Sequence, residues 1–156
     1  MIPPSIQSFL DKRGIRFRAA EHEPRPTSQE IAATSHISGK HFAKTVVLKT
    51  GHGEFLLAVV PATEHLNLQR LSEWIGRGVE LAGEQEFAAM FPDCEVGAMP
   101  PFGELYNLPV LVDGCLARSG KLAMSAGTHR DMIEMSWDDF RSVANARVIE
   151  HSALWH

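Results

Sequence analysis

Lys44 is the residue of this sequence whose type and position point most directly to chemistry. It stands in the run Ala43-Lys44-Thr45-Val46-Val47-Leu48, which has the composition of a β-strand. Side chains alternate along a strand, so Lys44 shares one face with Val46 and Leu48. An ammonium beside apolar side chains is costly unless it meets an anion or a cavity. Lys44 is therefore predicted to hold a phosphate or a carbonyl oxygen, and the alternative is a lysine whose stem lies along a strand end with its charge in water.

A second candidate is the loop Gly97-Ala98-Met99-Pro100-Pro101-Phe102-Gly103. The two prolines fix φ and lack an N–H group, while the flanking glycines permit unusual backbone angles, so the loop should be stiff and irregular. Its backbone amides at Ala98 and Met99 are predicted to polarise a carbonyl oxygen. The alternative is a tight turn with a structural role alone.

The third candidate is His129, which follows Gly127 and Thr128 between two predicted strands. A histidine there could hydrogen-bond a substrate or titrate near neutral pH, and the alternative is an ordinary exposed loop histidine. No metal site is expected, because the eight histidines include no His-x-x-x-His pair. Residues 114–121 resemble a phosphate loop only faintly, since Leu122 stands where Ser or Thr should follow the lysine.

The elements that position these residues are predicted from apolar spacing and turn residues. Two β-rich runs, residues 42–49 and 54–60, are joined by Thr50-Gly51-His52-Gly53 and predict a hairpin. The second run is apolar on both faces, so it should lie inside a sheet. Further strands are predicted at residues 15–22, 79–82, 108–113, 121–125 and 131–135. Helices are predicted at residues 5–13, 27–38, 68–75, 84–90 and 140–146, the last beginning near Ser136 and followed by a loosely held tail.

Composition favours one domain. The 156 residues are 44% hydrophobic and 22% charged, which suits a mixed α/β domain over residues 1–156 with a sizeable core. No apolar stretch is long enough for a membrane helix, and the first residues do not form a secretory signal, so we expect a soluble cytoplasmic protein. Cys94 and Cys115 are expected to be reduced, buried and structural.

Charge is distributed unevenly along the chain. The net charge of −4 argues against a broad DNA-binding surface. The first 50 residues, however, hold eight basic and four acidic residues, whereas the remainder holds seven basic and fifteen acidic ones. A basic region on an acidic body suits a partner that brings one small phosphate-bearing end, and a solvated face without a partner is the alternative.

Together, these segments resemble the YbaK family of free-standing aminoacyl-tRNA deacylases, which is related to the editing domain of bacterial prolyl-tRNA synthetase. The resemblance covers residues 20–146. Its motifs in this sequence are residues 43–49, 97–103, 108–113 (which ends at Asp113) and 126–129. The resemblance implies a central mixed, largely antiparallel and partly barrel-like sheet flanked by short helices.

The resemblance also implies a reaction, hydrolysis of the ester between a wrong amino acid and the terminal ribose of a tRNA, without metal or cofactor. Lys44 is then the central functional residue, and the other implied catalytic residues are Gly97, Ala98 and His129. The remaining pocket residues implied are Thr45, Met99, Pro100, Pro101, Gly127 and Thr128, of which Thr45 and Thr128 are specificity candidates. The expected partner is the acceptor end of an aminoacyl-tRNA, with a small amino acid such as Ala, Ser, Thr or Cys carried on tRNA for proline.

Two other functions fit the same residues. A binding or regulatory module associated with a synthetase could keep this pocket without turnover, since a lysine and an anion-binding loop serve binding as well. A hydrolase of another activated ester or amide is the second, although a neutral substrate would not need the basic first third of the chain. The sequence leaves open whether a synthetase or an elongation factor is a partner.

Overall fold

The β2–β3 hairpin lies at the centre of the sheet. The computed structural model describes residues 1–22 and 41–150. Strands β2 (Phe42–Thr50) and β3 (Phe55–Pro61) pair in antiparallel register from Ala43 opposite Pro61 to Lys49 opposite Phe55. Six of the seven β3 residues are buried, because helices or loops cover the strand on both faces. The predicted hairpin is confirmed.

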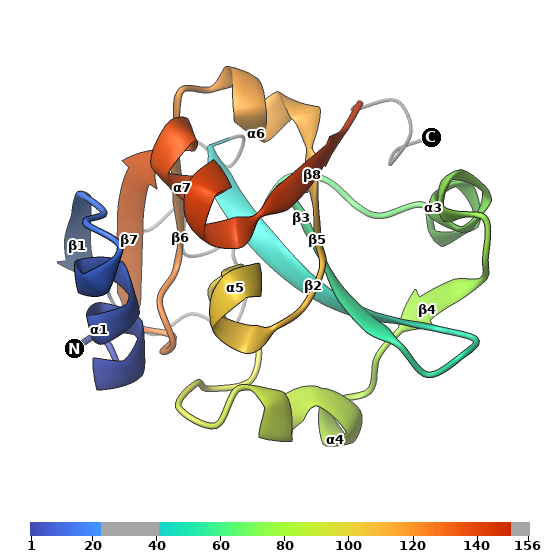
Figure 1. The fold of residues 1–156 in the computed structure, drawn as a ribbon, viewed down its shortest axis with the longest axis horizontal. Helices are drawn as coiled ribbons and strands as arrows, with labels where there is room; N and C mark the ends of the chain where they lie inside the picture. The colour runs from blue at the N-terminus through green and yellow to red at the C-terminus, as the bar shows by residue number, and fades with distance from the viewer. Residues whose placement is uncertain (23–40, 151–156) are drawn as a thin grey trace.

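The other strands extend the hairpin into one mixed sheet (Figure 1). They are β1 (Phe17–Glu21), β4 (Val79–Leu81), β5 (Val110–Asp113), β6 (Lys121–Ser125), β7 (Asp131–Ser136) and β8 (Ala146–Ile149). The order is β1-β7-β6-β2-β3-β5-β8, with β4 beside β2. The pairs β2–β6, β3–β5 and β5–β8 are parallel and the other four are antiparallel. A mixed sheet with short helices is thus confirmed.

Helices pack on both faces of this sheet. They are α1 (Pro4–Lys12), α3 (Leu68–Ile75), α4 (Glu84–Phe87) with the 3-10 turn η1 (Ala88–Met90), α5 (Gly103–Tyr106), α6 (Gly114–Arg118) and α7 (Trp137–Ala144). The expected caps are present, since Asn67 Oδ1 accepts from the Arg70 amide at 3.0 Å and Ser136 Oγ from the Asp139 amide at 3.1 Å. Helices α1, α5 and α7 lie on the same side of the sheet (Figure 1).

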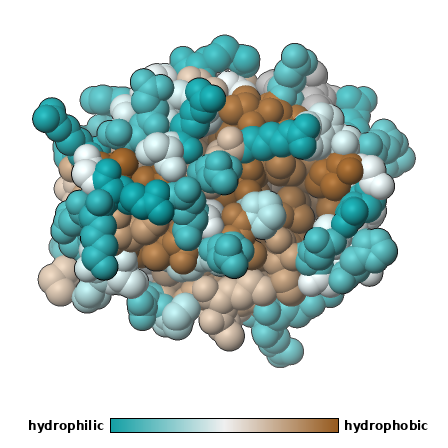
Figure 2. Space-filling view, viewed as in Figure 1, coloured by the Kyte–Doolittle hydropathy of each residue, from teal (hydrophilic) through white to brown (hydrophobic). Residues whose placement is uncertain are grey.

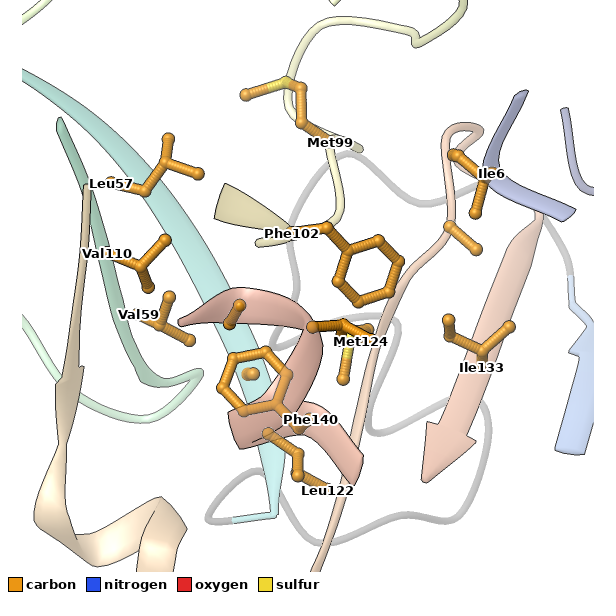
Figure 3. Packing of buried hydrophobic residues seen from close by; sticks show 14 of the residues in the cluster. Ile6, Leu57, Val59, Met99, Phe102, Val110, Leu122, Met124, Ile133 and Phe140 are labelled. Atoms are coloured by element: carbon orange, nitrogen blue, oxygen red, sulfur yellow. The ribbon is translucent and has the colours of Figure 1, made fainter. Parts of the chain in front are cut away.

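The sheet separates a larger core from a smaller one. The larger core contains Phe102 and Phe140, which lie among residues from α1, β3, β5, β6 and β7 (Figure 3). The smaller core gathers Leu48, Val60 and Leu71 on the opposite face. Alternate residues of β2 divide between them, because Ala43 and Val47 join the larger core whereas Leu48 joins the smaller one.

The structure corrects the sequence prediction at four places. The last helix ends at Ala144, where Asn145 adopts a left-handed φ of 50°, and the residues predicted as a loose tail form β8. Helix α6 occupies the segment that resembled a phosphate loop, and Asp113 caps it by accepting from the Cys115 amide at 2.8 Å. Helix α5 starts inside the predicted irregular loop, and the helix predicted at 84–90 divides into α4 and η1. The helix predicted at 27–38 lies outside the described residues.

Candidate active site

Lys44 lies where two central strands stop pairing. It stands opposite Val60 of β3, and its neighbour Ala43 is the last β2 residue paired with β6, opposite Met124. Alternation turns the Lys44 side chain toward the face of the smaller core, the side of Val46 and Leu48. The divergence of β2 from β6 thus begins at a half-buried lysine.

The Lys44 ammonium is fixed by one backbone acceptor. Its Nζ donates to the carbonyl oxygen of Glu64 at 2.7 Å. Burial lowers the pKa of Lys44, while the negative charge of Glu64 acts in the opposite direction. An ammonium carries three N–H donors, and within residues 1–22 and 41–150 Glu64 is the one acceptor it has. Of the residues that the structure describes, none accepts from the other two donors, which suits an anion or a carbonyl oxygen.

The two glycine-containing loops are in direct contact. The Glu95 amide donates to the Gly127 carbonyl and the Gly127 amide donates to the Ala98 carbonyl, both at 2.8 Å. Gly97 and Gly127 adopt φ of 88° and 96°, which favours glycine at these two positions. The structure therefore brings the predicted loop of residues 97–101 against the predicted stretch of residues 127–129. Because β6 ends at Ser125, in line with Lys44, the second loop begins at the same place in the sheet.

His129 is held against the first loop. Its Nε2 lies 2.9 Å from the Val96 carbonyl oxygen, and its amide donates to the Glu95 carboxylate at 3.1 Å. A carbonyl oxygen only accepts, so Nε2 is the donor of this hydrogen bond and Nδ1 is the other ring nitrogen. Nδ1 is buried and has no hydrogen-bond partner in the part of the chain that the structure describes. His129 thus combines a fixed ring with one unused basic nitrogen.

Thr128 and Gly127 shape the turn that carries His129. The Thr128 hydroxyl donates to the Asp131 carboxylate at 2.7 Å and accepts from the amides of Arg130 and Asp131. Gly127 lies against Pro3, the N-cap residue of α1, where an added Cβ would come within 2.6 Å of the proline ring. Because its hydroxyl is used inside the turn, Thr128 positions the loop, and its part in specificity stays a prediction.

The geometry departs from the sequence-based site at two residues. The Ala98 amide donates to the Glu95 carbonyl at 3.0 Å, so it already has an acceptor, contrary to its expected donation to a substrate carbonyl. Thr45 stands opposite Val59, and alternation turns it toward the larger core, away from the face of Lys44.

The rest of the loop is packed into the protein. Met99, Pro100 and Pro101 are buried, and Met99 belongs to the larger core (Figure 3). The Gly97 amide donates to Met99 Sδ at 3.2 Å. These buried residues therefore anchor the loop to the larger core and fix its shape.

Two acidic residues join the site without having been predicted. Glu64 supplies a backbone carbonyl to Lys44, and backbone contacts leave no trace in residue type. Glu95 holds the His129 loop through both its amide and its carboxylate. Its position two residues before Gly97 is the one signal that could have pointed to it.

The largest surface hollows lie elsewhere. Figure 2 shows apolar residues gathered at the centre of one face and ringed by polar ones. One hollow of about 530 Å³ is lined by Phe55, Leu56, Trp74 and Leu111 among others. Its residues Thr50 and Glu54 mark the turn end of the β2–β3 hairpin, far along β2 from Lys44. Among the described residues, no group of three or more His, Cys, Asp or Glu could hold a metal ion, and no helix is long and apolar enough to span a membrane.

Known proteins share the sequence pattern and the fold. Residues 22–143 match the model of the aminoacyl-tRNA editing domain family. A curated relative, the multifunctional Ser/Thr-tRNA deacylase ProXp-y of Escherichia coli strain K12, is 24% identical over 147 residues, which is 91% of this chain and 87% of the relative.

Two crystal structures superpose over nearly the whole chain. One, described as a candidate trans-editing enzyme for prolyl tRNA synthetase, gives a TM-score of 0.81 at 21% identity and covers 96% of this chain and 98% of that one. The other, a hypothetical protein, gives 0.83 at 24% identity and covers 94% and 97%. At these identities the two likenesses show the fold alone.

Proposed function

Because this chain belongs to the aminoacyl-tRNA editing domain family, we propose that it is a trans-editing deacylase whose central functional residue is Lys44. The observation that carries the proposal is the half-buried Lys44 ammonium, which keeps two donors for substrate within the segment matched by the family. The activity is that of an aminoacyl-tRNA deacylase, as in the curated relative's name.

The proposed substrate is a tRNA, with tRNA for proline first, that carries a small wrong amino acid. Alanine, serine, threonine and cysteine are the candidates, and serine and threonine come first because the curated relative is named for them. One methylene changes binding in an apolar pocket by only about 1 to 3 kcal/mol, so a synthetase alone discriminates poorly between amino acids of similar size. A separate site that accepts and hydrolyses esters of the smaller amino acids corrects such errors after the tRNA has been charged.

The proposed reaction is attack of one water on the ester carbonyl carbon. The bond between the carbonyl carbon and the ribose oxygen breaks, and the water oxygen stays with the amino acid. A proton from the water passes to the ribose oxygen, which becomes a hydroxyl again. Lys44 binds the terminal phosphate or orients the ester, where its fixed charge stabilises the developing oxyanion. The neighbouring ribose hydroxyl helps to place the water, and no step is assigned to a metal.

His129 is proposed as a positioning residue. Its ring donates to the Val96 carbonyl and its amide donates to the Glu95 carboxylate, so His129 connects the loops of residues 95–98 and 127–129. Because Nδ1 is buried, His129 is proposed to act by holding the two loops together and not by direct contact with the attacking water. The Ala98 amide already donates to the Glu95 carbonyl, so it is given no part in polarising the ester.

The direct test is single-turnover deacylation of alanyl-, seryl-, threonyl- and cysteinyl-tRNA and of mischarged tRNA for proline. Wild type and Lys44→Ala are compared on radiolabelled substrates. We expect rapid release from at least one substrate and a loss of about 100-fold or more in the variant. Unchanged hydrolysis by Lys44→Ala would refute its role, and tRNA binding without release from any substrate would favour a regulatory module.

A further inference from the structure

A cleft of about 380 Å³ lies beside Lys44 and takes no part in the reaction described above. Its wall includes His41, Thr63, Glu64, Cys115, Arg118 and Ser119. Glu64 joins the two sites, because its carbonyl oxygen accepts from Lys44 Nζ while the same residue lines the cleft. Only Glu64 therefore separates a ligand bound at Lys44 from the cleft, and such a ligand can extend past Glu64 into it.

Arg118 brings a guanidinium to the wall of this cleft. Its Nη2 donates to Cys115 Sγ at 3.4 Å, and within the described part of the chain it forms no ion pair. A guanidinium has five N–H donors in a planar arrangement that matches phosphate oxygens. Burial raises the pKa of the Cys115 thiol, so the cleft does not offer a reactive thiolate. Its chemistry is that of binding.

Glu64 adds an acidic residue to the wall of the cleft. Its negative charge opposes the lowering of the Lys44 pKa by burial and adds to the raising of the Cys115 pKa. A free phosphate would meet this carboxylate as well as Arg118. A nucleotide fits better, because its phosphate can face Arg118 while a ribose hydroxyl donates to Glu64.

We propose that this cleft binds the nucleotide that precedes the aminoacylated terminal adenosine, with Arg118 on its phosphate and Glu64 on its ribose. The inference rests on the proposed function, since it places the ester at Lys44. It adds a second contact region that recognises the acceptor strand, whereas the Lys44 region recognises the ester.

The test compares a substrate that has the acceptor strand of tRNA with one that lacks it. Arg118→Ala is assayed on an aminoacyl-tRNA and on the matching 2′(3′)-O-aminoacyl adenosine, which has no phosphate. We expect KM for the tRNA to rise about tenfold with kcat unchanged, and the rate on aminoacyl adenosine to stay at the wild-type value. Arg70→Ala on the exposed side of α3 is the matched control and should behave as wild type. Equal loss on both substrates, or no change on either, would overturn the proposal.

A binding measurement separates this proposal from the proposed function. The trinucleotide CCA, without an amino acid, is titrated against wild type, Arg118→Ala and Arg70→Ala by fluorescence anisotropy. We expect about tenfold weaker binding to Arg118→Ala alone and a shallower salt dependence. Glu64→Gln should reduce the preference for CCA over the same trinucleotide with a deoxyribose at its central position. If Arg118→Ala binds CCA as tightly as wild type does, the proposed nucleotide site in the cleft is refuted, whether or not the protein hydrolyses aminoacyl-tRNA.

Discussion

The two faces of the β2–β3 hairpin differ in what their side chains contact. Ala43 and Val47 point into the larger core, where Phe102 and Phe140 are fully buried. Lys44 points to the other face and places an ammonium at the start of a row that continues with Leu48 in the smaller core. One residue of alternation therefore separates packing from chemistry on the same strand.

This difference has an energetic consequence. Burial of apolar side chains stabilises the fold, whereas burial of the Lys44 ammonium disfavours its charged form and lowers its pKa. The larger core should therefore control stability, and the Lys44 side should control activity with little effect on stability. The predictions below test that separation.

Phe102→Ala should cause the largest loss. The ring is fully buried and packs against Phe9 with ring centroids 5.7 Å apart, so its removal leaves a cavity in the larger core. We expect the free energy of unfolding to fall by about 3 to 5 kcal/mol, measured by urea denaturation. Deacylation per folded molecule at low temperature should stay within a few-fold of wild type. A stable Phe102→Ala protein would contradict the assignment of stability to this face.

Gly127→Ala should lower stability by about 1 to 3 kcal/mol, because φ is 96° and the new methyl would lie 2.6 Å from the Pro3 ring. Gly120→Ala is the matched control, since Gly120 has φ of 76° but no neighbouring atom within 4 Å. The difference between the two melting temperatures isolates the contact with α1. Equal melting temperatures would show that α1 does not hold the His129 loop.

Gly97→Ala should mainly reduce activity. Its φ of 88° strains any side chain, and the new Cβ would lie 3.4 Å from His129 Cε1, in ordinary contact. We expect about a tenfold fall in kcat, equivalent to about 1.4 kcal/mol, because the loop shifts against His129. Gly53→Ala, at φ of 79° in the hairpin turn, should show a similar stability loss with normal activity. Normal kcat in Gly97→Ala would remove this loop from the reaction.

Lys44→Met should change stability least, by less than about 1 kcal/mol for a half-buried group. The pKa of Lys44 is lower in the folded protein than in the unfolded chain, so the penalty for burying its charge is complete below the folded pKa. The penalty disappears as pH rises from the folded pKa to 10.5, where the unfolded chain also loses the proton. The stability advantage of Lys44→Met over wild type should therefore shrink between pH 7 and pH 10.5 in urea denaturation. An advantage that grows with pH would contradict this sign.

Much of the fold could be predicted, because its signals are local. The hairpin follows from two β-rich runs, and α3 and α7 follow from the capping residues Asn67 and Ser136. Strand β8 could not be predicted in this way. Arg147 and Val148 are exposed on this strand at the end of the sheet order, so its alternation is weak and its pairing with β5 depends on the tertiary fold.

The candidate site could be predicted in part. Lys44 is conspicuous because a cation is unusual in an apolar strand. The contacts that orient the site run through backbone atoms, such as the Glu64 carbonyl and the Ala98 amide, and residue type does not report them. For that reason residue type does not point to Glu64. It also does not show that the Ala98 amide, predicted to donate to a substrate carbonyl, already donates within the turn.

The central claim is that Lys44 acts on the ester while the fold does not depend on it. Single-turnover hydrolysis of the preferred aminoacyl-tRNA by wild type and Lys44→Met, with melting temperatures of the same samples, tests both halves. We predict a rate at least about 100-fold lower in a variant that melts at or above the wild-type temperature. A variant that hydrolyses the ester at the wild-type rate, or one that loses activity only because it unfolds, would contradict the account.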